Sequence, residues 1–270
     1  MSALQAGRRM PAIFLGHGSP MNAIEDNRFS RAWRALGEAL PRPGGIVVVS
    51  AHWLTRGSAV TAALRPSTIH DFGGFPKALF DVDYPAPGSA ALAQAVVRVL
   101  QPRAVELDQG WGLDHGAWSV LRHLYPAADV PVVQLSLDRM AAPAAHYAIG
   151  CALSRLREEG VLLLGSGNIV HNLAAMDWRR RDSEYPWARR FEDHVIQAIR
   201  TGEHEGLWEY PRLGQDAALA VPTPDHYLPL LYVMGAARGD DAVRLLTPHI
   251  EYGSLSMTSV LVGGPLEAGT

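Results

Sequence analysis

The stretch Gly45-Ile-Val-Val-Val-Ser50 decides the fold class of this 270-residue chain. Its four consecutive β-branched apolar residues indicate a strand that is buried on both faces, as interior parallel strands are. Apolar runs of the same kind recur at residues 12–15, 131–136 and 160–165, and segments with the apolar spacing of helices separate them. We therefore expect a single α/β domain, with a central mixed, largely parallel sheet and helices on both faces.

The other expected elements follow the same alternation. Helices are expected where apolar residues recur at helical spacing, at residues 29–40, 89–100, 115–125, 142–158, 187–200 and 227–237. Shorter strands are expected at residues 58–64, 104–107, 243–246 and 255–262. No repeat or linker divides the chain, so we expect the domain to span residues 11–263, with an N-terminal extension at 1–10 and a tail at 264–270.

Composition and charge exclude several classes of protein. The chain is 48% hydrophobic and 19% charged, values typical of a soluble globular protein. Its net charge of −3 gives no sign of a nucleic-acid or anionic-membrane partner. The arginine cluster at 179–181 is flanked by Asp177 and Asp182, which predicts a solvated loop. The N-terminus lacks the apolar core of a signal peptide and no apolar run reaches membrane-spanning length, so we expect a cytoplasmic protein.

The single cysteine, Cys151, excludes an internal disulfide and structural cysteine–zinc sites. It lies in an alanine-rich helical segment, so we expect it to be a small buried apolar residue. No cysteine therefore competes with histidine for the role of metal ligand.

Most of the 11 histidines have no distinctive position. His249 follows Pro248, and the sequence suggests no partner for it. His70 opens the loop at 66–87, whose length and aromatic content are typical of an ordered binding loop. Four histidines lie in or beside helical segments among charged residues and are predicted to be at the surface: His123, His146, His194 and His204.

Three histidines follow strands. His17 comes after the first strand, His52 after the second and His171 after the strand at 160–165. Ligands of open α/β sheets bind beyond the carboxyl ends of the strands, so these side chains are expected to converge. Each one alone is better explained as a hydrogen-bonded histidine at a strand end. Together they favour a metal site, because neutral imidazole is the commonest metal ligand.

Other catalytic motifs fit less well. Gly165-Ser166-Gly167 is not the Gly-x-Ser-x-Gly turn of hydrolases, because glycine directly flanks the serine. Gly16-His-Gly-Ser19 lacks the spacing and the lysine of a phosphate-binding loop. Neither serine nucleophile chemistry nor nucleotide binding is predicted.

Six motifs occur in an order that is specific to one family. They are Gly16-His-Gly-Ser-Pro-Met21, Val49-Ser-Ala-His-Trp53, Ile69-His-Asp-Phe-Gly-Gly-Phe-Pro76, Leu113-Asp-His-Gly-Ala-Trp118, Ser166-Gly-Asn-Ile-Val-His-Asn-Leu173 and Pro222-Thr-Pro-Asp-His-Tyr-Leu-Pro-Leu230. This set resembles the class III (LigB-type) extradiol ring-cleavage dioxygenases and is most similar to their 4,5-DOPA extradiol dioxygenase branch. The resemblance covers residues 11–263, so it implies one catalytic domain there.

The resemblance implies one mononuclear, non-haem metal site with His17, His52 and His226 as ligands. It implies that His171 is the acid/base residue and a fourth ligand when substrate is absent, and that His115 lies near oxygen and substrate. Family members that act on protocatechuate supply a carboxylate where this chain has His226. Three histidines are also the ligand set of hydrolytic zinc sites. Fe(II) is therefore expected for dioxygenase activity, with Zn(II) as the alternative bound ion.

The implied reaction is the cleavage of a DOPA-like catechol by O2, which yields a muconic semialdehyde. The implied partners are the catechol and O2, and the protein is expected to be a monomer or a small homo-oligomer. Arg56 is a candidate for binding a substrate carboxylate. Four further residues are predicted to be on the substrate side of the site: Trp53, His70, Phe75 and Asp225.

Three alternatives remain open at this point. One is a zinc-dependent hydrolase on the same three histidines. Another is a metal-binding interaction protein like the Memo proteins, although a pure scaffold would not need both His115 and His171. The third is a histidine cluster that is satisfied within the core and holds no metal.

Overall fold

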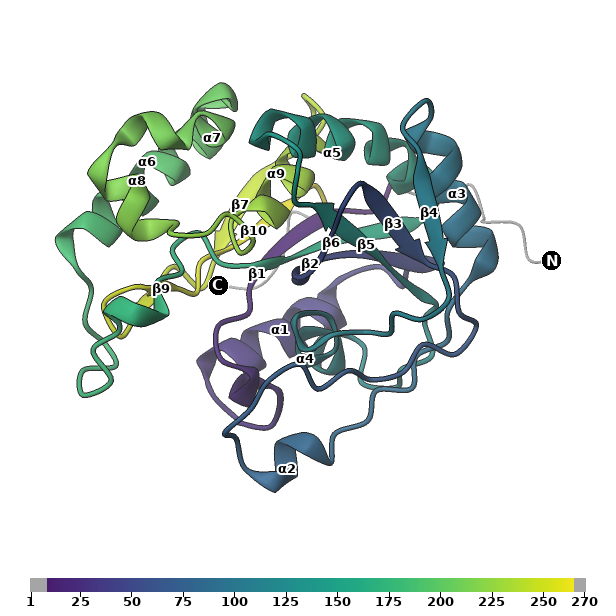
Figure 1. Ribbon diagram of the computed structural model, residues 1–270, viewed down its shortest axis with the longest axis horizontal. Helices are drawn as coiled ribbons and strands as arrows, with labels where there is room; N and C mark the ends of the chain where they lie inside the picture. Colours follow the sequence, from purple (N-terminus) through teal and green to yellow (C-terminus); the bar gives the residue numbers. More distant parts are fainter. Residues whose placement is uncertain (1–8, 265–270) are drawn as a thin grey trace.

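The β-branched run at 46–49 forms the centre of strand β2 (Gly45–Thr55), and its four residues are fully buried. In the computed structural model, which describes residues 9–264, β2 pairs in parallel with β5 (Val132–Asp138) and β6 (Val161–Gly167). Strand β6 in turn pairs in parallel with β1 (Ala12–Gly16). These four strands form the parallel centre of the sheet (Figure 1).

Shorter strands extend the sheet on both sides, in the order β4-β3-β5-β2-β6-β1-β10-β7. Strand β3 (Ser58–Thr61) is antiparallel to β5 and parallel to β4 (Val105–Asp108). At the other edge, β10 (Ser259–Val262) is antiparallel to β1 and to β7 (Val243–Leu246). The predicted mixed, largely parallel sheet is confirmed.

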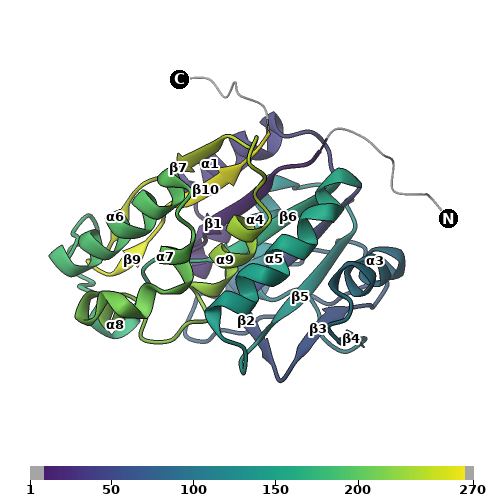
Figure 2. The ribbon, with the colours of Figure 1, turned by 90° about the horizontal axis from the view of Figure 1, so that it is seen from above.

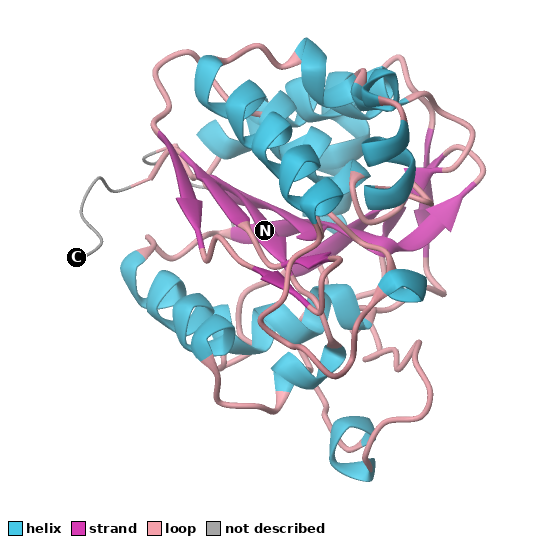
Figure 3. Ribbon diagram, turned by 90° about the vertical axis from the view of Figure 1, so that its left-hand side faces the viewer, coloured by secondary structure: helices cyan, strands magenta, loops and turns pink. Residues whose placement is uncertain are grey.

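Helices cover both faces of this sheet (Figure 3). One face packs against α3 (Ala90–Leu100), α5 (Pro143–Glu158) and α9 (Leu228–Gly235), the helices in front in Figure 2, with α6 (Pro186–Thr201) beside them. The opposite face packs against α1 (Arg28–Ala39) and α4 (His115–Leu124). Alternate residues of the central strands point into these two separate cores, as the strand period of two requires.

The remaining elements are short. They are η1 (Pro20–Ala23), α2 (Lys77–Phe80), η2 (Leu173–Ala175), α7 (Glu205–Trp208), η3 (Tyr210–Leu213), α8 (Gln215–Ala220), β8 (Ile250–Glu251) and β9 (Leu255–Ser256). Strands β8 and β9 pair with each other outside the main sheet, so the strand expected at 255–262 is divided in two.

Strand β2 is longer than the sequence indicated. It continues to Thr55 through a register shift, in which Val49 pairs with Leu135 and Leu54 pairs with Leu137. Four residues of β2 therefore stand opposite one residue of β5. His52 lies within this irregular stretch of the strand rather than after the strand.

Three predictions about exposure are wrong. His123 and His146 are buried, because His123 Nε2 bonds to the Asn22 carbonyl (2.8 Å) and His146 Nδ1 bonds to the Tyr232 hydroxyl (2.9 Å). Cys151, expected to be buried, is exposed on α5.

The predicted chain ends fall mostly outside the described residues. Residues 1–8 and 265–270 are not described, whereas Met10 is buried and its N–H donates to the Arg157 carbonyl (2.9 Å). Among residues 9–264, no helix has the length and apolar character needed to cross a membrane.

Candidate metal centre

Backbone contacts between the strand ends bring His17 and His226 to one place. The His17 N–H donates to the Gly167 carbonyl at the end of β6 (3.0 Å), and the Asn168 N–H donates to the His226 carbonyl (2.8 Å). A Cβ atom on Gly167 would lie 2.1 Å from the His226 carbonyl oxygen. Glycine is therefore needed at 167 for the loop before α9 to approach β6 so closely.

The rings of His17, His52 and His226 form a nearly equilateral triangle. Their centres are 5.2 Å (His17–His52), 5.3 Å (His17–His226) and 5.0 Å (His52–His226) apart. Imidazoles bound to one tetrahedral ion through nitrogens at ~2.1 Å have ring centres about 5 Å apart. The separations of the ring centres, taken alone, match those expected around a shared ion.

His115 lies close to the same group. One ring nitrogen each from His17, His52 and His115 can be chosen so that all three lie within 4.8 Å of one another. The ring centre of His115, however, is 3.9 Å from that of His52 and 5.8 Å from that of His17. The 3.9 Å separation is too short for two ligands of one tetrahedral ion, so the geometry fits His226 better than His115 as the third member.

Hydrogen bonds fix the tautomers of two of these rings. The Ser166 hydroxyl donates to the Gly116 carbonyl (2.6 Å), so it accepts a hydrogen bond from His17 Nδ1 (3.0 Å). His226 Nδ1 donates to the Asp225 carboxylate (2.5 Å). Both rings are left with a lone pair on Nε2, and His17 Nε2 lies 3.3 Å from His52 Nε2. Nδ1–H donation to an oxygen acceptor is the usual second contact of a metal-binding histidine.

Burial keeps the rings of His17 and His52 neutral. Burial, with repulsion from the neighbouring histidines, lowers the pKa values of His17 and His52 well below the ordinary range. Burial opposes the ionisation of Asp225, but the hydrogen bond from His226 holds the pKa of that carboxyl below its ordinary value. Neutral imidazoles beside an ionised carboxylate form a donor set suited to a divalent cation.

Asp71 connects His115 to this group and was not identified as a site residue from the sequence. One Asp71 oxygen accepts hydrogen bonds from the backbone N–H and from Nδ1 of His115, both at 2.9 Å. The other oxygen lies 3.6 Å from His52 Nδ1. Asp114 caps α4 by accepting the Ala117 N–H (3.1 Å), which places His115 in the first turn of that helix.

His171 lies flat against His226. Their ring centres are 3.4 Å apart and the rings are within 4° of parallel. The His171 N–H donates to the Ala220 carbonyl (2.9 Å), and His171 forms an antiparallel bridge with Leu255 of β9. Burial, with repulsion from His226, lowers the pKa of His171 to about 3. The ring is therefore neutral at neutral pH, with a lone pair on one ring nitrogen.

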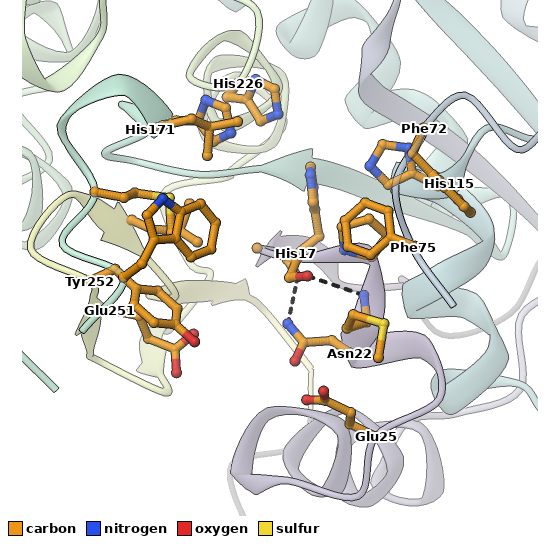
Figure 4. Close-up of a pocket in the computed structure, with 18 of the residues that line it drawn as sticks. His17, Asn22, Glu25, Phe72, Phe75, His115, His171, His226, Glu251 and Tyr252 are labelled. Carbon is orange, nitrogen blue, oxygen red and sulfur yellow. Dashed lines mark hydrogen bonds between the residues drawn. The ribbon is translucent and has the colours of Figure 1, made fainter. Parts of the chain in front are cut away.

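All five histidines line one cavity of about 430 Å³ (Figure 4). Phe72 and Phe75 form a wall beside His115, while Glu25 and Glu251 lie on the side away from His171 and His226. Met21, Met176 and Trp178 add apolar surface, so the cavity suits a flat aromatic ligand with a polar group at each end.

Several residues predicted on the substrate side lie elsewhere. Phe75 lines the cavity, but Trp53 is buried and stacks on Trp111, with ring centres 5.4 Å apart. His70 bonds to the Val82 carbonyl (3.0 Å) and is not among the lining residues, and Arg56 is exposed away from the cavity. Asp225 contacts the site only through His226.

The arginine that lines the cavity is Arg181, from the cluster that was predicted to be a solvated loop. Its Nε atom donates to the buried carboxylate of Glu251 (2.6 Å). Asp71 and Phe72 could have been identified as site residues from the sequence, because both lie inside the motif at 69–76. No local pattern marks Arg181 or Glu251.

Comparisons with known proteins identify the family of this chain. The family model described as the catalytic LigB subunit of aromatic ring-opening dioxygenase matches residues 11–263. A protein of Escherichia coli strain K12 named 4,5-DOPA dioxygenase extradiol is 52% identical over 265 residues, which cover 96% of this chain and 97% of that protein. A Beta vulgaris protein of the same name is 37% identical, covering 92% of this chain and 96% of its own.

A solved structure shows the same fold. The crystal structure of an uncharacterised Escherichia coli K12 protein matches with a TM-score of 0.83 and 47% identity, over 94% of this chain and all of that one. Such a match confirms the single α/β domain. Because the family model spans nearly the whole described chain, this protein belongs to the LigB family of aromatic ring-opening dioxygenases.

Proposed function

We propose that this protein is a metal-dependent extradiol dioxygenase that opens the ring of a DOPA-like catechol with O2 and yields a muconic semialdehyde. One observation carries the proposal. Three imidazoles of matched spacing, two with Nε2 free by their hydrogen bonds, converge in a cavity that has aromatic walls. We further propose that the enzyme is cytoplasmic and needs no partner beyond the catechol and O2.

In this proposal His17, His52 and His226 hold the metal. A bound Fe(II) would supply a Lewis-acidic, redox-active centre with positions open to both catechol oxygens and to O2. Nδ1 of His226 is bonded to Asp225, and Nδ1 of His17 is bonded to Ser166. The lone pair of each ring is therefore on Nε2, the nitrogen that would bind the metal.

His171 is the proposed proton acceptor. Its ring is neutral and lines the cavity beside His226, so a ring nitrogen can take the proton of a catechol hydroxyl. The negative charge of Asp225 acts against the effect of burial and favours the protonated ring. The acquired proton is then available for a later step of ring opening.

His115 is the second proton-handling group. With Nδ1–H donated to Asp71, its Nε2 atom is the one left for a ligand, and the carboxylate stabilises the ring if Nε2 becomes protonated. Phe72 and Phe75 pack beside His115 and shield this end of the cavity from water.

The test is reconstitution. Purified protein is loaded with Fe(II) without air, given L-DOPA, and then exposed to O2. We expect a yellow ring-cleavage product, which His171→Ala should abolish while the bound iron remains. A wild-type protein with iron bound at the three histidines that turns over no catechol contradicts the proposal. Hydrolysis of an ester or amide under nitrogen by the zinc-loaded protein would instead support a hydrolase on the same ligands.

A further inference from the structure

Resting on the function proposed above, we propose that Arg181, held by the buried Glu251, binds a carboxylate on the side chain of the catechol. It thereby selects acidic catechols over neutral ones. The cavity offers no other permanent cation, since Arg181 is the only lysine or arginine among its lining residues in the described chain.

The contacts of Arg181 leave most of its guanidinium group available. Its Nε atom is bonded to Glu251, and within residues 9–264 its two terminal nitrogens have no hydrogen-bond partner. The Arg181 side chain is 45% exposed, whereas the Glu251 side chain is only 3% exposed. A guanidinium anchored through Nε presents its remaining N–H groups in a fixed fork, the arrangement that binds a carboxylate through two bonds.

The backbone around Arg181 is also fixed. The Tyr252 N–H donates to the Arg181 carbonyl (2.7 Å), and the Tyr252 ring packs against Trp178 with ring centres 5.3 Å apart. Trp178 and Tyr252 both line the cavity. The loop with Arg181 and the turn after β8 therefore form one unit at the cavity wall.

The placement fits a catechol with a short acidic side chain. Glu251, the anchor of Arg181, lies on the side of the cavity opposite His171 and His226 (Figure 4). A ring bound next to the histidines would direct its side chain toward this wall. Glu25 on the same side disfavours a bare carboxylate and favours one accompanied by an ammonium group.

The test uses two ligands that differ at the carboxyl group alone: L-DOPA and its primary amide, compared at a pH where both keep the ammonium group. KM and kcat are measured with wild type, Arg181→Gln and Arg180→Gln, whose exposed arginine does not line the cavity. We expect a KM roughly tenfold lower for the acid than for the amide in wild type and in Arg180→Gln, as one charge-assisted hydrogen bond provides. Arg181→Gln should lose this preference, and Arg181→Lys should keep part of it.

Equal weakening of acid and amide by Arg181→Gln would overturn the proposal, as would wild type with no preference. If the unpaired Glu251 prevents folding, the double variant Arg181→Gln/Glu251→Gln replaces the ion pair with two amides and takes its place. Dissociation constants measured under nitrogen separate this inference from the proposed function. An Arg181-dependent preference in binding, without turnover of either compound, would refute the dioxygenase assignment and leave the carboxylate site standing.

Discussion

The histidines that line the cavity and the histidines buried in the helical layers behave differently, although both groups are shielded from water. His17 and His226 use Nδ1 to reach an oxygen acceptor and keep Nε2 for the cavity. His146 on α5 bonds to Tyr232 through Nδ1, but its Nε2 atom is buried without a partner among residues 9–264. The rings of His17 and His226 keep a lone pair for a ligand, whereas the ring of His146 packs in a core.

This difference shows that burial alone does not mark a functional histidine. The cavity-lining rings occur where tight turns and backbone contacts bring five imidazoles to one cavity. The helical rings lie singly in packed cores. Substitutions in the first region should therefore change metal binding and activity, and substitutions in the second should change stability alone.

The largest effect is expected from removal of a ligand. His226→Ala should lower metal affinity by more than the ~10- to 100-fold that loss of an outer partner costs, whereas His115→Ala should retain the metal. Metal content after dialysis against a weak chelator, and the rise in Tm on adding metal, measure this. The opposite ranking would show that His17, His52 and His115 are the ligands.

A smaller loss is expected when the link between His115 and His52 is weakened. Asp71→Asn removes the charge that orients His115 Nδ1–H, and kcat/KM should fall by roughly 10- to 100-fold with the fold intact. Asp81→Asn, in the same loop but exposed and paired with Lys77, is the matched control and should be near wild type. Equal activity in the two variants would remove Asp71 from the site.

The close approach of β6 to the loop before α9 can be tested through Gly167. The added methyl group of Gly167→Ala would collide with the His226 carbonyl, which should destabilise the protein by about 1–3 kcal/mol and weaken metal binding. Gly239→Ala, where a Cβ meets nothing within 4 Å, should have little effect on either. Chemical denaturation and metal titration of both variants decide the matter; unchanged metal binding in Gly167→Ala would argue against the strand-end geometry.

The smallest effect concerns the helical region. Burial lowers the pKa of His146 to about 4, so the folded state resists a proton that the unfolded chain accepts below about pH 6.5. The contribution of His146 to the free energy of unfolding is therefore independent of pH above about pH 6.5. It falls as the pH drops toward 4, by about 1 kcal/mol between pH 7 and 5.5. His146→Gln should lack this part of the pH dependence, and the exposed His194→Gln should retain it. Parallel curves of unfolding free energy for wild type and His146→Gln would contradict the assignment.

Most of the fold was predictable from local patterns. The run at 46–49 and the helical spacing of the other segments gave the sheet and both helical layers, because burial on two faces leaves a clear signature in composition. The surface assignment of His123 was wrong because α4 is buried on nearly all sides, so the polar residues beside it did not mark an exposed face.

The site was predictable only in part. The three histidines with matched spacing came from their positions and from ordered motifs, and their role as ligands stays a prediction. Asp71 could not be given its role, because its contact with His115 spans 44 residues. The contact of Arg181 was not predicted, because its partner, Glu251, lies 70 residues further along the chain. Contacts at such separations depend on the folded topology, which local spacing does not encode.

The register shift in β2 has one more consequence. Between Val49 and Leu54 the sheet needs one residue to match Ser136 of β5, and the chain provides four. His52 lies in that surplus length, beyond Ser50, which pairs with Ser166 of β6. Shortening the surplus by one residue would leave the pairing of both halves of β2 available while rotating His52 out of the cavity. One proposed ligand, His52, therefore lies on a segment of β2 that is longer than the pairing with β5 requires. A change of length in this segment would alter the site and leave the pairing of the sheet in place.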